Sequence, residues 1–238
     1  MIGCLFIHGF TGAPYEVEPL AKDIEEKMGW VVKVPTLPGH GVTLSLKGHT
    51  YNEWVAHAEQ ELITLMDEVD EVYVIGFSMG GIIASYLAAK YKVKKLVLLS
   101  AAAYYINPKQ LLLDCLEVVR DAWRGQLKQN ELYVRYRTKL RNTPIKATRE
   151  FQKLVKMVRP ILKDLTVPVL IIQGERDGIV PVKSAHFLYK TIPSPMKELK
   201  LLPSSKHHIC YGDDYEELRK HVEEFLSDER SLIPNSLS

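Results

Sequence analysis

The stretch that most constrains this chain is a Gly-x-Ser-x-Gly pattern centred on Ser78. An apolar, β-branched run at 72–75 precedes it and predicts a buried strand. An alanine-rich run at 82–91 follows it and predicts a helix. A serine between strand and helix needs a tight turn, in which side chains at Gly76 or Gly80 would collide with their neighbours. We therefore expect Ser78 to stand exposed above the sheet edge, at the positive end of its helix, as a candidate nucleophile. A turn used only for packing is the alternative interpretation.

The rest of the chain alternates short apolar runs with amphipathic runs. The apolar runs predict strands at 3–8, 30–34, 72–75, 94–100, 167–174 and 197–202. The amphipathic runs predict helices at 14–28, 50–69, 82–91 and 182–191, and a final helix after Asp213. Thr50–Glu53 and Asp213–Glu216 each match the capping-box pattern of a helix start. This alternation predicts an α/β fold, with a mostly parallel, doubly wound sheet of about six strands and helices on both faces.

One long segment, residues 103–164, interrupts this alternation because it has no strand signal. Asn107 followed by Pro108 predicts a helix start, and Phe151 opens an apolar stripe with i, i+3, i+4, i+7 spacing. We therefore divide the chain into an α/β core, residues 1–102 and 165–238, and a helical cap, residues 103–164, inserted in that core. An insertion at the carboxyl edge of the sheet would sit over the serine turn.

The composition is that of an ordinary globular protein, with 46% hydrophobic and 25% charged residues. The net charge of +2 gives no argument for nucleic-acid binding, although residues 104–160 hold thirteen Lys and Arg against five Asp and Glu. The three cysteines show no close pairing and predict free buried thiols in a reducing compartment. No run approaches the ~18 apolar residues that span a bilayer, and the first residues predict a strand and not a signal peptide. We expect a cytoplasmic protein without integral membrane contact. The sequence does not indicate whether the protein is a monomer or an oligomer.

Polar candidates follow four of the predicted strands. In a parallel sheet the functional groups lie at the carboxyl ends of the strands, which selects the loops at Phe10, Ser78, Asp177 and His207–His208. A serine nucleophile needs a base within hydrogen-bond reach and an acid that orients the base. The order Ser78, Asp177, His207 is also the chain order that this sheet architecture uses. These three side chains are therefore the candidate nucleophile, acid and base.

The acid and the base each have an alternative. Asp177 also fits an Asx-turn that caps the next helix, and Glu175 is a second acid in the same loop, nearer the strand. His208 competes with His207 for the role of base. A metal site of His207, His208 and Cys210 has a spacing that matches no trusted ligand pattern, so we predict no metal.

Five short motifs together carry a resemblance to a known family. They are His8–Gly12, Pro38–Gly41, Gly76–Gly81, Gly174–Asp177 and Ser205–His207. With this set the chain resembles the α/β-hydrolase superfamily, and within it the small carboxylesterases and monoacylglycerol lipases of Bacillus type. The resemblance covers nearly the whole chain. The chain departs from the usual family pattern at Lys206, where the family usually has Gly. We also expect the antiparallel strands that open larger members of the family to be missing, so the sheet should be small.

The resemblance implies roles for individual residues. Ser78 would be the nucleophile, Asp177 the acid and His207 the base. The backbone N–H groups of Phe10 and Met79 would form the oxyanion hole, and the helical insertion would be the cap. No cofactor would be needed.

The predicted reaction is hydrolysis of a small-molecule ester of short to medium chain length, including monoacylglycerols, through an acyl-enzyme. An apolar acyl pocket would be lined by Trp54, Tyr104, Tyr105, Ile106, Leu111, Leu112 and Trp123, with core packing as the alternative for each. The basic segment would attract anionic surfaces or substrates, or would simply be a solvated face. Aryl or cinnamoyl esterase, thioesterase and C–C hydrolase or lyase chemistry use the same triad. The non-enzyme alternative is a ligand-binding protein on a hydrolase scaffold.

Overall fold

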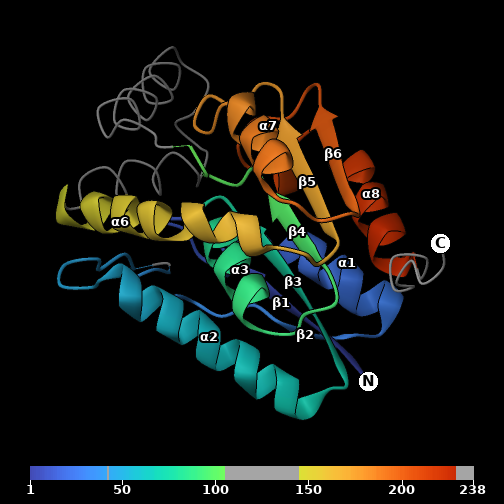
Figure 1. The fold of residues 1–238 in the computed structure, drawn as a ribbon, viewed down its shortest axis with the longest axis horizontal. Helices are drawn as coiled ribbons and strands as arrows, with labels where there is room; N and C mark the ends of the chain where they lie inside the picture. Colours follow the sequence, from blue (N-terminus) through green and yellow to red (C-terminus); the bar gives the residue numbers. More distant parts are fainter. Residues whose placement is uncertain (42, 105–144, 229–238) are drawn as a thin grey trace.

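The computed structural model describes residues 1–41, 43–104 and 145–228. Six parallel strands form one sheet in the order β2-β1-β3-β4-β5-β6 (Figure 1). The strands are β1 (Ile2–Ile7), β2 (Val31–Lys33), β3 (Glu71–Phe77), β4 (Leu96–Leu99), β5 (Val169–Gly174) and β6 (Lys197–Leu202). The prediction of a small parallel sheet is confirmed. Because every pairing is parallel, the carboxyl ends of these strands meet at one edge.

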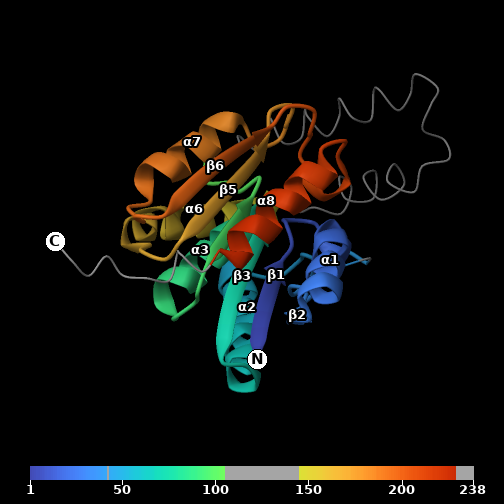
Figure 2. The same cartoon turned by 90° about the vertical axis from the view of Figure 1, so that its right-hand side faces the viewer.

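Helices cover both faces of the sheet, as predicted. One face carries α2 (Tyr51–Glu68), α3 (Met79–Lys90) and α7 (Val182–Thr191), with α6 (Ile145–Ile161) packed on α3 and α2. The other face carries α1 (Glu18–Met28) and α8 (Tyr215–Ser227) (Figure 2). Short 3₁₀ turns lie at η1 (Pro14–Glu16), η2 (Leu162–Asp164) and η3 (Ile209–Tyr211).

The four inner strands, β1, β3, β4 and β5, are buried on both sides, and their alternate residues belong to two separate cores. In β1, Leu5 and Ile7 belong to the core shared with α2 and α3, whereas Cys4 and Phe6 belong to the core shared with α1 and α8. All four side chains are fully buried. This is the pattern expected of a parallel strand with helices on both faces. It explains why the strand signal in the sequence is a continuous apolar run.

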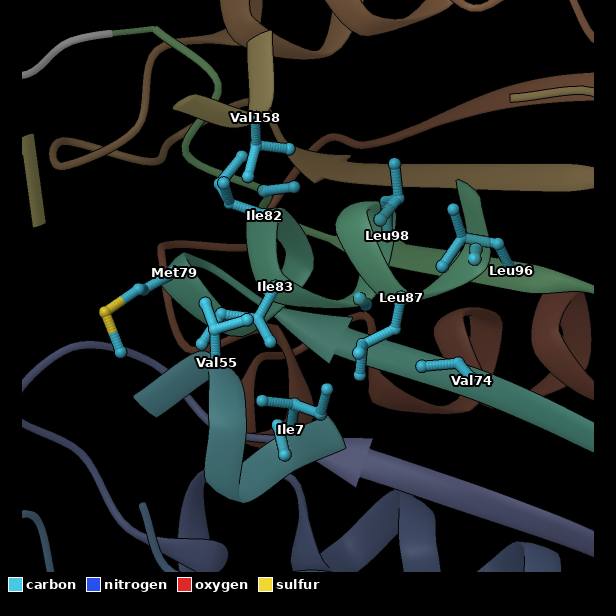
Figure 3. Close-up of a cluster of buried hydrophobic side chains, with 14 of the residues drawn as sticks. Ile7, Val55, Val74, Met79, Ile82, Ile83, Leu87, Leu96, Leu98 and Val158 are labelled. Atoms are coloured by element: carbon cyan, nitrogen blue, oxygen red, sulfur yellow. The ribbon is translucent and has the colours of Figure 1, made fainter. Parts of the chain in front are cut away.

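Helix α3, which starts directly after Ser78, is enclosed by other elements. It packs against β3, β4 and β1 on the sheet side and against α6 and α2 on the outer side. Figure 3 shows Ile82 beside Val158 of α6, and Ile83 facing Ile7 of β1. Fully burying one such aliphatic side chain contributes about 1.5–3 kcal/mol. Packing on all sides therefore fixes the start of α3, and Ser78 with it, relative to the sheet.

The capping box predicted at the start of α2 is wrong. Thr50 does precede the helix, but its side chain makes no capping hydrogen bond to a helix N–H. Its hydroxyl instead contacts a Glu53 carboxylate oxygen at 3.4 Å. The other Glu53 oxygen lies 2.7 Å from His49 Nδ1, outside the helix. The Glu53 carboxylate is thus shared with a neighbouring imidazole, and the hydrogen bond from the Thr50 hydroxyl to a helix N–H, which a capping box requires, is not made.

The capping box predicted at Asp213 is also wrong. Helix α8 begins one residue later, after Asp214, and no side chain caps it. The Asp214 carboxylate accepts hydrogen bonds from the Ser204 N–H at 2.8 Å and the Ser205 hydroxyl at 2.9 Å. These bonds hold the loop that leads to His207, so this carboxylate serves the site loop and not the helix.

Most of the predicted cap lies outside the described residues, including the helix start at Asn107. Its C-terminal part forms α6, in which Leu154, Val155 and Val158 are buried against the core. The apolar stripe that begins at Phe151 is therefore helical, as predicted. The division of the chain at 103–164 stays a prediction.

Two further findings bear on the class of protein. Among the helices of the described residues, none combines the length and the apolar character that crossing a bilayer requires. Cys4 and Cys210 are buried free thiols, whereas Cys115 lies outside the described residues.

Candidate active site

The turn between β3 and α3 holds Ser78 in a strained backbone conformation, with φ 54° and ψ −115°. Such a conformation costs a residue with a Cβ about 1–3 kcal/mol. A Cβ on Gly76 would lie 2.3 Å from the Gly80 carbonyl oxygen, and a Cβ on Gly80 would lie 2.1 Å from the Ile7 carbonyl oxygen. The two glycines of the pattern are therefore a steric requirement of this turn.

Ser78 is 7% exposed, so the expectation that it stands exposed is wrong. Its N–H donates to the Leu99 carbonyl at 2.9 Å, and its own carbonyl accepts from the Ala102 N–H at 3.2 Å. The His207 ring lies against its hydroxyl. These neighbours bury the serine at the N-terminal end of α3, where the helix dipole favours a developing negative charge.

Three side chains from separate loops meet at the carboxyl edge of the sheet. His207 Nε2 lies 3.1 Å from Ser78 Oγ, and His207 Nδ1 lies 2.8 Å from Asp177 Oδ2. All three residues are at most 8% exposed. In this arrangement an imidazole can take the proton of a hydroxyl while a carboxylate orients its other nitrogen. The structure brings these candidates together, and their catalytic roles stay a prediction.

Asp177 is surrounded by hydrogen-bond donors. Its Oδ1 accepts from the N–H groups of Ile179 and Val180, both at 2.8 Å, and its Oδ2 accepts from the Gln173 amide at 2.8 Å. Burial raises the pKa of Asp177, but the His207 ring and the backbone donors outweigh burial and hold the pKa below its ordinary value. An ionised Asp177 can only accept hydrogen bonds, so His207 carries its proton on Nδ1 and presents a basic Nε2 to the serine.

Gln173 is a site residue that the sequence reasoning missed. It is fully buried at the end of β5, where its amide also donates to the Val180 carbonyl at 3.1 Å. The signal was present as a single amide that follows the apolar run 167–172. A buried polar side chain in such a strand requires a partner. Here that partner is the carboxylate of Asp177.

The candidate oxyanion donors are the N–H groups of Phe10 and Met79. Within the described residues, neither N–H donates to a loop or side-chain acceptor. Met79 opens α3, and the first N–H groups of a helix have no intrahelical partner. Both groups are thus available to a ligand at the serine turn.

His8 fixes the direction of the Phe10 N–H. His8 Nε2 accepts a hydrogen bond from the Leu37 N–H at 3.0 Å, so the ring proton is on Nδ1, which donates to the Gly9 carbonyl at 2.9 Å. The Gly12 N–H donates to the same carbonyl at 3.1 Å. Because the peptide unit is planar and trans, holding the Gly9 C=O also aims the N–H of Phe10 in the opposite direction.

The competing candidates have other partners. His208 Nε2 lies 3.3 Å from Glu16 Oε1, and Glu175 is exposed. Cys210 is buried, and burial, together with Glu16, raises the pKa of its thiol to about 12. Among the described residues, no group of three or more His, Cys, Asp or Glu side chains could hold a metal ion. The geometry therefore favours His207 over His208, and Asp177 over Glu175.

The predicted acyl-pocket residues are only partly described. Trp54 is fully buried, donates its indole N–H to the Pro38 carbonyl at 3.0 Å and lies 5.8 Å from the Phe10 ring. It therefore packs behind the Phe10 loop. Tyr104 is half-buried, with its ring 5.1 Å from the Phe187 ring. The remaining candidates lie outside the described residues: Tyr105, Ile106, Leu111, Leu112 and Trp123.

The described part of the basic segment borders a cavity of about 970 Å³ between α6 and α7. Its cationic lining residues are Arg149, Lys153, Lys156, Arg159 and Lys163. The Arg159 guanidinium lies 4.6 Å from the centre of the Phe187 ring, a cation–π distance. Ser78 is not among the lining residues. Part of the positive charge of the segment is thus gathered on one side of α6.

A parallel sheet with helices on both faces, and a serine at a strand–helix turn beside a histidine and an aspartate, define the α/β-hydrolase class. The family model described as "Serine aminopeptidase, S33" matches residues 3–214. The chain therefore belongs to the serine aminopeptidase S33 family of serine hydrolases.

Characterised relatives agree with the resemblance predicted from the motifs. The chain is 29% identical over 210 residues to a thermostable monoacylglycerol lipase of Bacillus sp. strain H-257, covering 87% of this chain and 82% of the relative. It is 25% identical over 224 residues to a carboxylesterase of Bacillus subtilis strain 168, covering 93% and 91%. A solved structure of the metagenome-derived lipolytic enzymes LipS and LipT matches with a TM-score of 0.77 at 24% identity, covering 94% of this chain and 93% of that one. The predicted superfamily is confirmed.

Proposed function

We propose that this chain hydrolyses carboxylic esters of short to medium acyl chain length, including monoacylglycerols, through an acyl-enzyme. The observation that carries the proposal is the hydrogen-bonded series from Asp177 to His207 to Ser78, with distances of 2.8 and 3.1 Å. Both distances are within the range that proton transfer requires. The names of the two Bacillus relatives support an ester over a peptide as substrate.

In the first half-reaction, Ser78 Oγ attacks the carbonyl carbon while its proton passes to His207 Nε2. Asp177 stabilises the resulting imidazolium through Nδ1. The carbonyl oxygen becomes an oxyanion that the N–H groups of Phe10 and Met79 bind, and loss of one such donor typically costs ~10²–10³ in rate. Collapse of the intermediate breaks the ester C–O bond, and the Nε2 proton goes to the departing alcohol. Water then repeats the sequence on the acyl-enzyme and releases the acid.

The test compares the wild-type protein with Ser78→Ala and with Ser45→Ala, a control at an exposed serine. Each protein is treated with a fluorophosphonate, and the adduct is located by mass spectrometry. Turnover is measured on p-nitrophenyl esters from acetate to laurate, on a monoacylglycerol, on a feruloyl ester, on an acyl thioester and on an aminoacyl p-nitroanilide.

An adduct on Ser78 in the wild type and the control, with ester turnover lost in Ser78→Ala, supports the proposal. Preference for the anilide would reassign the chain to peptide hydrolysis, and preference for the feruloyl ester or thioester would change the substrate class. Absence of both adduct and turnover would overturn the catalytic proposal and favour a ligand-binding role.

A further inference from the structure

Glu16 is a buried carboxylate that the proposed reaction does not use. It ends η1 and is 2% exposed. Burying a carboxylate is costly unless donors surround it. The groups that this carboxylate contacts therefore indicate why it is there.

One Glu16 oxygen holds the loop that carries Phe10. Oε2 accepts a hydrogen bond from the Gly9 N–H at 2.9 Å. A Cβ on Gly9 would lie 3.1 Å from the same oxygen, and a Cβ on Gly12 would lie 1.8 Å from it. The loop backbone thus lies directly on the carboxylate on both sides of Phe10, and glycine is required at Gly12 to allow this approach.

The other Glu16 oxygen faces the loop that carries the proposed base. Oε1 lies 3.3 Å from Nε2 of His208, the residue that follows His207. The rings of these two histidines are 5.5 Å apart. A second contact joins the same segments, since the Tyr211 hydroxyl donates to the Tyr15 carbonyl at 2.5 Å. Glu16 thus connects two loops that are far apart in the sequence.

We propose that Glu16 is a positioning residue for the hydrolysis proposed above. Its carboxylate bridges the Gly9 N–H and the His208 ring, and so sets the separation between the oxyanion donor at Phe10 and the base His207. Both groups act on the same tetrahedral intermediate, and a displacement of about 1 Å can cost ~100-fold in rate. The inference rests on the proposed function, because positioning has a measurable effect only on a working site.

The test uses Glu16→Ala, Glu16→Gln and His208→Ala. The alanine variant at Glu16 removes both arms of the bridge, the isosteric glutamine keeps an acceptor for the Gly9 N–H, and His208→Ala removes one arm only. Glu18→Gln is the matched control, because the Glu18 side chain is about half exposed (47%) and pairs with Lys22 on the surface at 3.1 Å. Values of kcat and KM are measured on p-nitrophenyl butyrate, and folding is followed by circular dichroism and Tm.

Glu16→Ala is expected to lower kcat by about 10- to 100-fold with KM changed less than about threefold, since the loss lies in the transition state. Glu16→Gln should recover kcat to within about fivefold of wild type, His208→Ala should fall between them, and Glu18→Gln should match wild type. A merely structural role would lower Tm and leave kcat of the folded fraction unchanged.

A folded Glu16→Ala protein with kcat within about twofold of wild type would overturn the proposal. So would a glutamine variant that loses as much as the alanine variant, because a hydrogen-bond acceptor would then not be what the loop needs. If Glu16→Ala does not fold, the glutamine variant and His208→Ala decide, and unchanged kcat in His208→Ala refutes the bridge. A wild-type protein without adduct or turnover refutes the proposed function itself, whereas an active wild type with indifferent Glu16 variants refutes only the positioning role.

Discussion

The strained turn at Ser78 leads to a prediction about stability that is independent of substrate. At φ 54° and ψ −115°, any residue with a Cβ carries strain of about 1–3 kcal/mol, whereas glycine does not. Ser78→Ala and Ser78→Gly both remove the hydroxyl and its contact with His207, so that loss cancels when the two variants are compared. Glycine also gives the unfolded chain more conformational entropy, which lowers the stability of Ser78→Gly by about 0.5–1 kcal/mol. Ser78→Gly should therefore be more stable than Ser78→Ala, by up to about 2.5 kcal/mol.

The control is the same chemical change at an ordinary backbone position. Ala56 lies inside α2 and is exposed, so Ala56→Gly changes little except helix propensity. It should lower stability by about 1 kcal/mol. The sign of the alanine-to-glycine effect is thus expected to reverse between the helix and the serine turn.

The free energy of unfolding is measured by urea titration with circular dichroism, and Tm is measured by calorimetry. For a chain of this size, 1 kcal/mol corresponds to about 2–4 °C in Tm. Both Ser78 variants should also lack ester turnover. If Ser78→Gly is less stable than Ser78→Ala by as much as Ala56→Gly is below wild type, the turn stores no strain and the reasoning is refuted.

Three other predictions follow from the described contacts. Asp177→Asn should lower kcat on p-nitrophenyl esters by about 10³–10⁴-fold, because an amide turns His207 to the wrong tautomer. The pKa of Asp177 is lower in the folded protein than in the unfolded chain, so the ionised carboxylate stabilises the fold above its unfolded pKa. This stabilisation is lost as the pH falls through the pKa of the folded state. The urea midpoint of Asp177→Asn, which lacks the carboxylate, should therefore vary less with pH in acid than the midpoint of wild type. Gly80→Ala should lower stability by about 1–3 kcal/mol or more in a urea titration, because its Cβ would lie 2.1 Å from the Ile7 carbonyl oxygen. Cys4 and Cys210 should resist a thiol reagent in the native protein and react after denaturation, because burial raises the pKa of both thiols.

Each of these has a contrary result. Retention of kcat in a folded Asp177→Asn protein would remove the acid from the proposed mechanism. If the urea midpoint of Asp177→Asn decreases in acid as much as that of wild type, other carboxylates cause the pH dependence of stability. Wild-type stability in Gly80→Ala would mean that the turn relaxes without cost. Fast labelling of Cys210 in the native state would mean that its loop opens readily.

What could be predicted from the sequence depended on local rules. The strands, the parallel sheet and the serine turn follow from apolar runs, alternation and the steric demands of Gly76 and Gly80. Contacts between distant segments were not predictable in this way. Gln173 appeared only as one amide in a strand. The capping boxes failed for two reasons: the Thr50 hydroxyl contacts Glu53, which His49 shares, and α8 begins after Asp214, whose carboxylate binds the Ser204–Ser205 loop.

The choice between the two adjacent histidines shows where such reasoning ends. His207 and His208 follow the same strand, and no local pattern says which ring turns toward the serine. In the structure, each histidine contacts a different buried carboxylate. His207 contacts Asp177, and His208 contacts Glu16, which is 192 positions away in the sequence. Each carboxylate is also held by a backbone N–H of its own loop, Val180 for Asp177 and Gly9 for Glu16. The identity of the proposed base therefore depends on two long-range pairings, which no local pattern in the sequence specifies.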